Sequence, residues 1–127
     1  MKDIEILTIT ADNTYIERRY YKRVIVSLNA DIISSNKSYR GVIENVAEKG
    51  LFIRIPSTKS AIDFIPGTMI EVKFQLLTGD ILTLYSEIRW LHTYITYTNS
   101  QRTLTNGIGI EILAPPRQYK EFFNSLF

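Results

Sequence analysis

The chain has 127 residues, of which 45% are apolar, which is the size and composition of a single domain with its own hydrophobic core. Because it has no cysteine, disulfides, thiolate nucleophiles and cysteine metal sites are excluded. Its 15 basic and 13 acidic residues give a net charge of +2, which is too balanced to predict binding of DNA or RNA over a broad basic face.

The hydropathy pattern does not indicate a membrane protein. No apolar run approaches the ~18 residues of a membrane span. The first ten residues alternate apolar and polar side chains and do not form the apolar block of a secretory signal. We therefore expect a cytoplasmic protein without membrane insertion.

Alternation of apolar and polar residues dominates the chain and predicts β-strands. It is clearest from Val24 to Ile32, where every second residue is apolar. Further strands are expected at 39–46, 51–55, 70–76, 81–97 and 107–113, separated by polar or glycine-containing turns. Six or seven strands without a helix between them predict an antiparallel, closed or nearly closed barrel, since closure removes exposed strand edges.

The run from 81 to 97 is the longest of these predicted strands. Its apolar residues, Trp90 among them, are expected on one face, and Arg89 on the other. The polar stretch 98–106 is expected to interrupt the sheet. The apolar stretch from Tyr94 to Tyr97 is expected to pack in the barrel.

The periodicity changes at the C-terminal end of the chain. Pro115 and Pro116 cannot donate hydrogen bonds to a sheet, so the last strand ends before them. Beyond them, aromatic and aliphatic residues recur with the spacing of one helix face, and we expect a short amphipathic helix within 115–127. These residues are Tyr119, Phe122, Phe123 and Leu126.

Residues for catalysis are scarce. The only histidine is His92, which is expected to be a packed or rim residue, and the carboxylates are scattered singly along the predicted strands. We therefore expect neither an enzyme nor a metal site, and no cofactor.

The densest charge lies at the start of the first strand. Four of the six residues from Arg18 to Arg23 are cationic. The guanidinium groups of Arg19 and Arg23 are suited to gripping phosphate or to stacking on and hydrogen-bonding guanine. The spacing alone is weak and favours a solvated charge run over a ligand site.

Two motifs in order make the pattern more specific. Arg19-Tyr20-Tyr21-Lys22-Arg23 is followed by Asn45-Val46-Ala47-Glu48-Lys49-Gly50, which resembles the paired signature of PilZ domains, Arg-x-x-x-Arg and then Asp/Asn-x-Ser-x-x-Gly. Gly50-Leu51-Phe52-Ile53 and Gly107-Ile108-Gly109-Ile110 also fit the family. The likeness covers Glu17 to Leu113 and implies a six-stranded antiparallel PilZ-like β-barrel with a short C-terminal α-helix that receives cyclic di-GMP.

The resemblance also implies roles for individual residues. Arg19 and Arg23 would hold phosphate and guanine, and Asn45 would meet a guanine edge. Gly50 would permit the tight turn that brings the second motif close to the ligand. Arg18 resembles a family position linked to the number of ligands bound, and an arginine there favours two.

One position departs from the family pattern. Ala47 stands where the family usually has serine, so a hydroxyl that would hydrogen-bond the ligand is absent. The loss of one neutral hydrogen bond costs about 0.5 to 1.5 kcal/mol, or roughly 2- to 10-fold in affinity. Weakened binding is therefore expected. Arg89 and Trp90 lie near the expected ligand rim, where Arg89 is a candidate for an additional contact.

The resemblance implies one domain over 1–127, with a flexible N-terminal segment 1–23, a barrel 24–113 and a helix 115–127. The expected function is a bacterial cyclic di-GMP receptor that folds its N-terminal segment over the ligand and signals to an unknown downstream protein in motility or biofilm regulation. Either a monomer or a homodimer fits.

Two alternatives stay open from the sequence. The first is a PilZ-like protein-interaction adaptor that no longer binds the nucleotide, which the alanine at position 47 allows. The second is a barrel that binds single-stranded nucleic acid through Tyr20, Tyr21 and the basic cluster, although the rest of the chain supplies no matching basic track.

Overall fold

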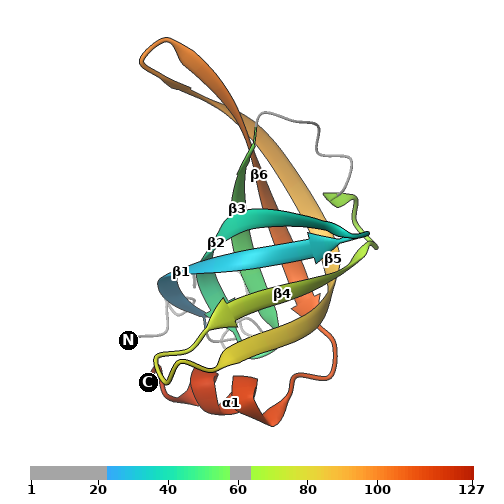
Figure 1. Ribbon diagram of the computed structural model, residues 1–127, viewed down its shortest axis with the longest axis vertical. Helices are drawn as coiled ribbons and strands as arrows, with labels where there is room; N and C mark the ends of the chain where they lie inside the picture. The colour runs from blue at the N-terminus through green and yellow to red at the C-terminus, as the bar shows by residue number, and fades with distance from the viewer. Residues whose placement is uncertain (1–22, 58–63) are drawn as a thin grey trace, which may run out of the picture.

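The computed structural model describes residues 23–57 and 64–127, which form six antiparallel strands and one helix (Figure 1). Most of the expected N-terminal segment 1–23, including Arg18 and Arg19, lies outside the described residues. The elements are β1 (Arg23–Ser34), β2 (Lys37–Ala47), β3 (Gly50–Ser57), β4 (Met69–Gln75), β5 (Ile81–Thr98), β6 (Gln101–Ile112) and α1 (Arg117–Asn124).

The strands close into a barrel in the order β1-β2-β3-β6-β5-β4. Closure depends on the antiparallel pairing of β1 with β4, in which Ile32 lies opposite Val72. The predicted all-β fold of six antiparallel strands with a short C-terminal helix is confirmed.

The core fills the inside of this barrel, and the predicted alternation explains it. Along β4, the buried Ile70, Val72 and Phe74 alternate with residues that are more exposed. Burial of each such side chain contributes about 1.5 to 3 kcal/mol. The remaining wall is built from β-branched and leucine side chains that are almost fully buried: Val24, Ile32, Ile43, Val46, Ile53, Ile55, Leu82, Leu84, Ile88, Ile108 and Ile112.

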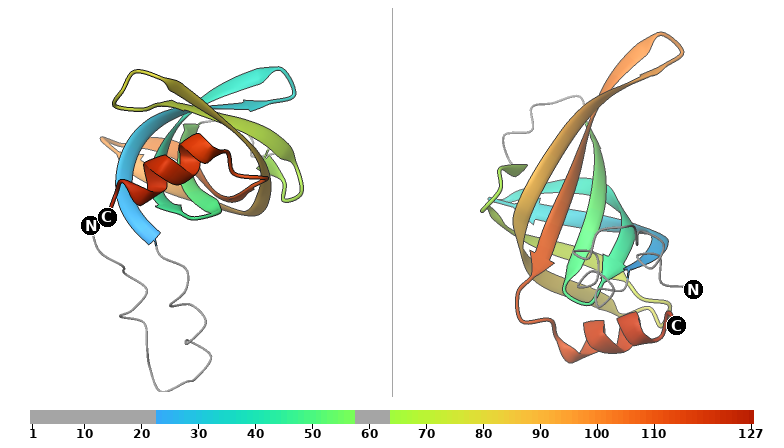
Figure 2. Two further views of the ribbon diagram at one scale, coloured as in Figure 1. Left: turned by 90° about the horizontal axis from the view of Figure 1, so that it is seen from below. Right: turned by 180° about the vertical axis from the view of Figure 1, so that it is seen from behind.

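Helix α1 covers one end of the barrel, as the view from below shows (Figure 2, left). Tyr119 and Phe123 are its buried residues, and Phe122 packs edge-on against Phe74 of β4 with ring centroids 5.4 Å apart. The predicted amphipathic helix is therefore confirmed, and its aromatic face belongs to the core. Outside the helix, the buried Phe64 packs edge-on against Tyr39 of β2.

The helix is also fastened to the turn between β2 and β3. The Tyr119 hydroxyl donates a hydrogen bond to the carbonyl oxygen of Ala47. Burial raises the pKa of Tyr119 well above its ordinary value, so the hydroxyl stays protonated and remains a donor. A backbone bond from the Ile112 amide to the Lys49 carbonyl, 2.8 Å long, holds the same turn from β6.

The prediction that 98–106 interrupts the sheet is wrong. Strands β5 and β6 stay paired up to Thr98 opposite Gln101, and they project beyond the barrel as a two-stranded ribbon (Figure 1). The chain reverses at Asn99 and Ser100, whose φ angles of 50° and 66° are typical of two-residue hairpin turns. Residues 99–102 at the tip of the ribbon are exposed, whereas Thr105 and Asn106 are buried although they are polar, so the polarity of 98–106 did not indicate a loop.

The expected packing of the stretch from Tyr94 to Tyr97 is wrong for the same reason. Tyr94, Ile95 and Tyr97 are exposed, Tyr97 by 72%, because this part of β5 extends past the core. His92 is also exposed and lies beside Tyr94, which fits the expected rim histidine. Among residues 23–57 and 64–127, no helix is long and apolar enough to cross a membrane.

Replacement of Tyr119 by phenylalanine tests the link between the helix and the turn. Tyr119→Phe keeps the buried ring but leaves the Ala47 carbonyl without its donor, so the free energy of unfolding should fall by about 1 kcal/mol. Urea denaturation measures this change. Tyr97→Phe, at a ring that is mostly exposed, is the control and should leave the midpoint unchanged. Equal midpoints for both variants would contradict a structural role for the hydroxyl.

Candidate functional site

An open pocket of about 180 Å³ lies over the strands around the β2–β3 turn. Five strands contribute to it: β1, β2, β3, β5 and β6. Its lining combines two arginines, an amide, two large aromatic rings and two glycines with a few smaller apolar residues: Arg23, Asn45, Ala47, Gly50, Leu51, Phe52, Arg89, Trp90, Gly109 and Ile110.

Strand register brings the two sequence motifs together. Arg23, the first residue of β1, lies opposite Ala47 at the end of β2. A bulge in β2 between Ile43 and Asn45 changes the alternation, and Asn45 then lies opposite Phe52 of β3. The last arginine of the first motif and the asparagine of the second therefore line one pocket.

Trp90 lies on the opposite face from the one predicted. A bulge in β5 between Ile88 and Trp90 adds one residue, so Ile88 is buried inside the barrel whereas Trp90 is 47% exposed outside it. A bulge shifts the alternation by one residue and carries no sequence signal of its own, so simple alternation assigned Trp90 to the core.

Trp90 forms an aromatic wall of the pocket together with Phe52. Their rings are stacked, with centroids 5.4 Å apart and planes 20° from parallel. The indole lies over Gly109 of β6, where an added Cβ atom would be 2.1 Å from the Trp90 Nε1 atom. The glycine is therefore needed for Trp90 to lie flat against the barrel.

The reason for a glycine at position 50 differs from the expected one. Gly50 is not in the left-handed region, and the glycines that are, Gly67 and Gly79, lie elsewhere. A Cβ atom at Gly50 would be 2.9 Å from the Ile110 carbonyl oxygen. Close approach of β3 to β6, and not the conformation of a tight turn, therefore explains the glycine.

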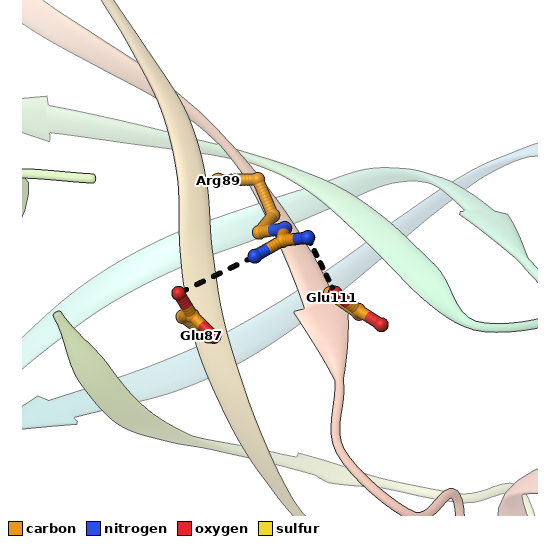
Figure 3. A network of polar contacts seen from close by, with 3 residues as sticks. All are labelled: Glu87, Arg89 and Glu111. Atoms are coloured by element: carbon orange, nitrogen blue, oxygen red, sulfur yellow. Dashed lines mark hydrogen bonds and ion pairs between the residues drawn. The ribbon is translucent and has the colours of Figure 1, made fainter. Parts of the chain in front are cut away.

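Arg89 lies within the β5 bulge and forms two ion pairs beside the pocket (Figure 3). One guanidinium nitrogen is 3.1 Å from a Glu111 carboxylate oxygen, and the other is 3.4 Å from a Glu87 carboxylate oxygen. The Arg89 side chain is 55% exposed, so it is partly available to a ligand.

The structure thus places Arg23, Asn45 and Gly50 in one pocket, whereas Arg18 and Arg19 lie outside the described residues. Sequence reasoning missed Phe52 and Gly109 as site residues. Gly109 belongs to a Gly-x-Gly pair whose alternation with buried isoleucines was visible, and this pair was the available signal.

The chemistry of this pocket suits a flat, negatively charged ligand. Guanidinium groups bind phosphate through paired hydrogen bonds, and exposed aromatic rings stack on bases. Within 23–57 and 64–127, no three His, Asp or Glu side chains gather to hold a metal ion.

A closed antiparallel barrel with a helix across one end and a cationic, aromatic pocket on its wall defines the class of this protein as a small all-β barrel domain. Comparison with known families is more specific: the PilZ domain matches residues 17–124. The chain belongs to the PilZ domain family.

Solved structures share this fold. The PilZ domain of YcgR from Escherichia coli, determined with c-di-GMP, superimposes with a TM-score of 0.67 at 10% identity and covers 86% of this chain and 88% of its own. Borreliella burgdorferi PlzA in complex with c-di-GMP gives 0.56 at 11% identity, covering 78% of this chain and 46% of its own.

The Bacillus subtilis inhibitor of motility, MotI/DgrA, gives a TM-score of 0.52 at 14% identity and covers 89% of this chain and 47% of its own. The present chain thus matches about half the length of PlzA and of MotI. No curated protein matches it in sequence.

The role of Gly50 can be tested by the sign of a stability change. At an unconstrained position, Gly→Ala stabilises a protein by about 0.4 to 1 kcal/mol through the unfolded state. Because a Cβ atom here meets the Ile110 carbonyl, Gly50→Ala should instead destabilise by about 1 to 3 kcal/mol. Urea denaturation of the ligand-free protein gives the sign, and a stabilised variant would contradict the packing explanation.

Proposed function

We propose that this protein is a cyclic di-GMP receptor or adaptor that changes conformation on binding and signals to a partner protein. The observation that carries the proposal is the meeting of Arg23, Asn45 and Gly50, from three strands, in one open pocket beside Trp90. Membership of the PilZ family supports it, and so do the complexes of YcgR and PlzA with this nucleotide.

Each part of the pocket has a proposed role. Arg23 pairs with a phosphate of the dinucleotide, and Asn45 hydrogen-bonds a guanine edge. The exposed part of Trp90 offers a stacking surface for a base. Gly50 keeps the second motif close to β6.

The N-terminal arginines complete the proposed site. Arg19 binds phosphate or guanine together with Arg23, and Arg18 favours a second ligand molecule. In this proposal, residues 1–23 fold over the bound nucleotide, and the altered surface is what the downstream protein recognises. The protein acts in the cytoplasm, without catalysis or cofactor, in motility or biofilm regulation.

Calorimetric titration with cyclic di-GMP tests this function directly. The wild-type protein should bind, and Arg23→Gln should lose about 10- to 100-fold in affinity because a charge-assisted contact is removed. A matched control is Arg40→Gln, since Arg40 is paired with Asp31 and does not line this pocket. Two ligands per protomer would support the role of Arg18, and absence of binding at high micromolar ligand would refute the receptor proposal.

Restoring the family serine gives a second, opposite test. Ala47 lines the pocket, so the hydroxyl of Ala47→Ser is placed to reach the ligand, and affinity should rise roughly 2- to 10-fold. The same titration measures the gain. The Tyr119 hydrogen bond uses the Ala47 backbone carbonyl, so the substitution leaves this bond in place. Unchanged affinity would mean that position 47 does not contact the ligand.

The alternative function is a protein-interaction adaptor that does not bind the nucleotide. Its supporting observations are Ala47 in the second motif and the exposed Tyr94, Ile95 and Tyr97 on the projecting ribbon, which offer an apolar surface to a partner. Failure of the wild-type chain to bind cyclic di-GMP would favour this alternative.

A further inference from the structure

Arg89 lines the pocket and is also paired with two carboxylates. It lines the same pocket as Arg23, and its side chain is half exposed. It also contacts the carboxylates of Glu87 and Glu111, and Figure 3 shows its guanidinium group between them. The same fork therefore cannot give all its donors to the carboxylates and to a ligand at once.

Glu87 and Glu111 lie close enough to repel each other, and Arg89 is positioned to offset this repulsion. Glu87 of β5 lies directly opposite Glu111 of β6, and like charges in that position repel. Glu111 is in turn opposite Gly50 across the β3–β6 pairing, which places a negative charge next to the second motif. In the ligand-free protein, Arg89 offsets this repulsion.

Charge around the pocket is consequently balanced. Arg23 and Arg89 supply two positive charges, and Glu87 and Glu111 supply two negative ones within the reach of Arg89. A ligand with two phosphates therefore approaches a pocket in which one of the two arginines, Arg89, is already paired with carboxylates. The ion pairs are exposed and individually weak, so they are exchangeable contacts.

We propose that Arg89 is a further phosphate-binding residue of the cyclic dinucleotide site. Its ion pairs with Glu87 and Glu111 compete with the ligand and so lower the affinity for the nucleotide. The proposal rests on the function proposed above. Binding transfers the Arg89 guanidinium from the carboxylates to a phosphate of the ligand, so the two glutamates act as positioning residues that set the concentration at which the receptor responds.

A double-mutant cycle with cyclic di-GMP as the probe tests this mechanism. Arg89→Gln should weaken binding about tenfold, since a charge-assisted contact is lost. Glu111→Gln should strengthen binding by up to about fivefold, the value of releasing Arg89 from an exposed ion pair. In the Arg89→Gln background, the gain from Glu111→Gln should shrink, because no guanidinium remains to be released.

Arg40→Gln and Asp31→Asn make the same charge changes in an ion pair that does not line this pocket, and they should not alter affinity. An equal gain from Glu111→Gln with and without Arg89 would show simple charge repulsion, and unchanged binding by Arg89→Gln would show that Arg89 does not touch the ligand. Either result overturns the proposal.

Failure of the proposed function gives a different pattern. If the wild-type chain does not bind, the receptor proposal fails. The variant with both Glu87→Gln and Glu111→Gln then decides the present inference. Binding by that variant that is lost when Arg89→Gln is added supports the restraint of Arg89. No binding by that variant, or binding that does not depend on Arg89, overturns it.

Discussion

Closure of the barrel through β1 and β4 is the constraint on which the rest of this structure depends. Three opposed pairs, with Ile32 facing Val72 at their centre, join the two strands, and they separate an inside from an outside. Inside, aliphatic side chains are almost fully buried. Outside, the same strands present Arg23, Asn45 and Trp90 to one pocket. A flat sheet of these strands would expose one face of the core.

The turn that carries the second motif is held in place by hydrogen bonds from helix α1 and strand β6. Tyr119 of α1 binds the Ala47 carbonyl, and the Ile112 amide binds the Lys49 carbonyl, so the turn carrying the second motif is held by the helix and by β6. For the proposed receptor function this order is favourable, because a turn that is already ordered loses little entropy when a ligand binds. The helix therefore contributes to the site, although its buried face belongs to the core.

Much of the fold and part of the site followed from the sequence. Alternation predicted the strands because inward positions need apolar residues, and the two motifs identified Arg23, Asn45 and Gly50 as neighbours. The error at Trp90 came from a bulge, which shifts the phase of alternation without a residue signature. The error at 98–106 came from polar residues that continue the strand, exposed near the hairpin turn and buried at Thr105 and Asn106. The pairing of Arg89 with Glu111 depends on strand register, which no single segment encodes.

The contact between Gly109 and Trp90 has a consequence for how this family member can diverge. Any side chain at position 109 would occupy space that the indole already fills, whereas a smaller residue at position 90 would vacate it. A side chain introduced at position 109 would therefore displace the indole from its place over β6 while the tryptophan is present. The two positions are therefore coupled, because the aromatic wall keeps its observed position only with glycine beside it.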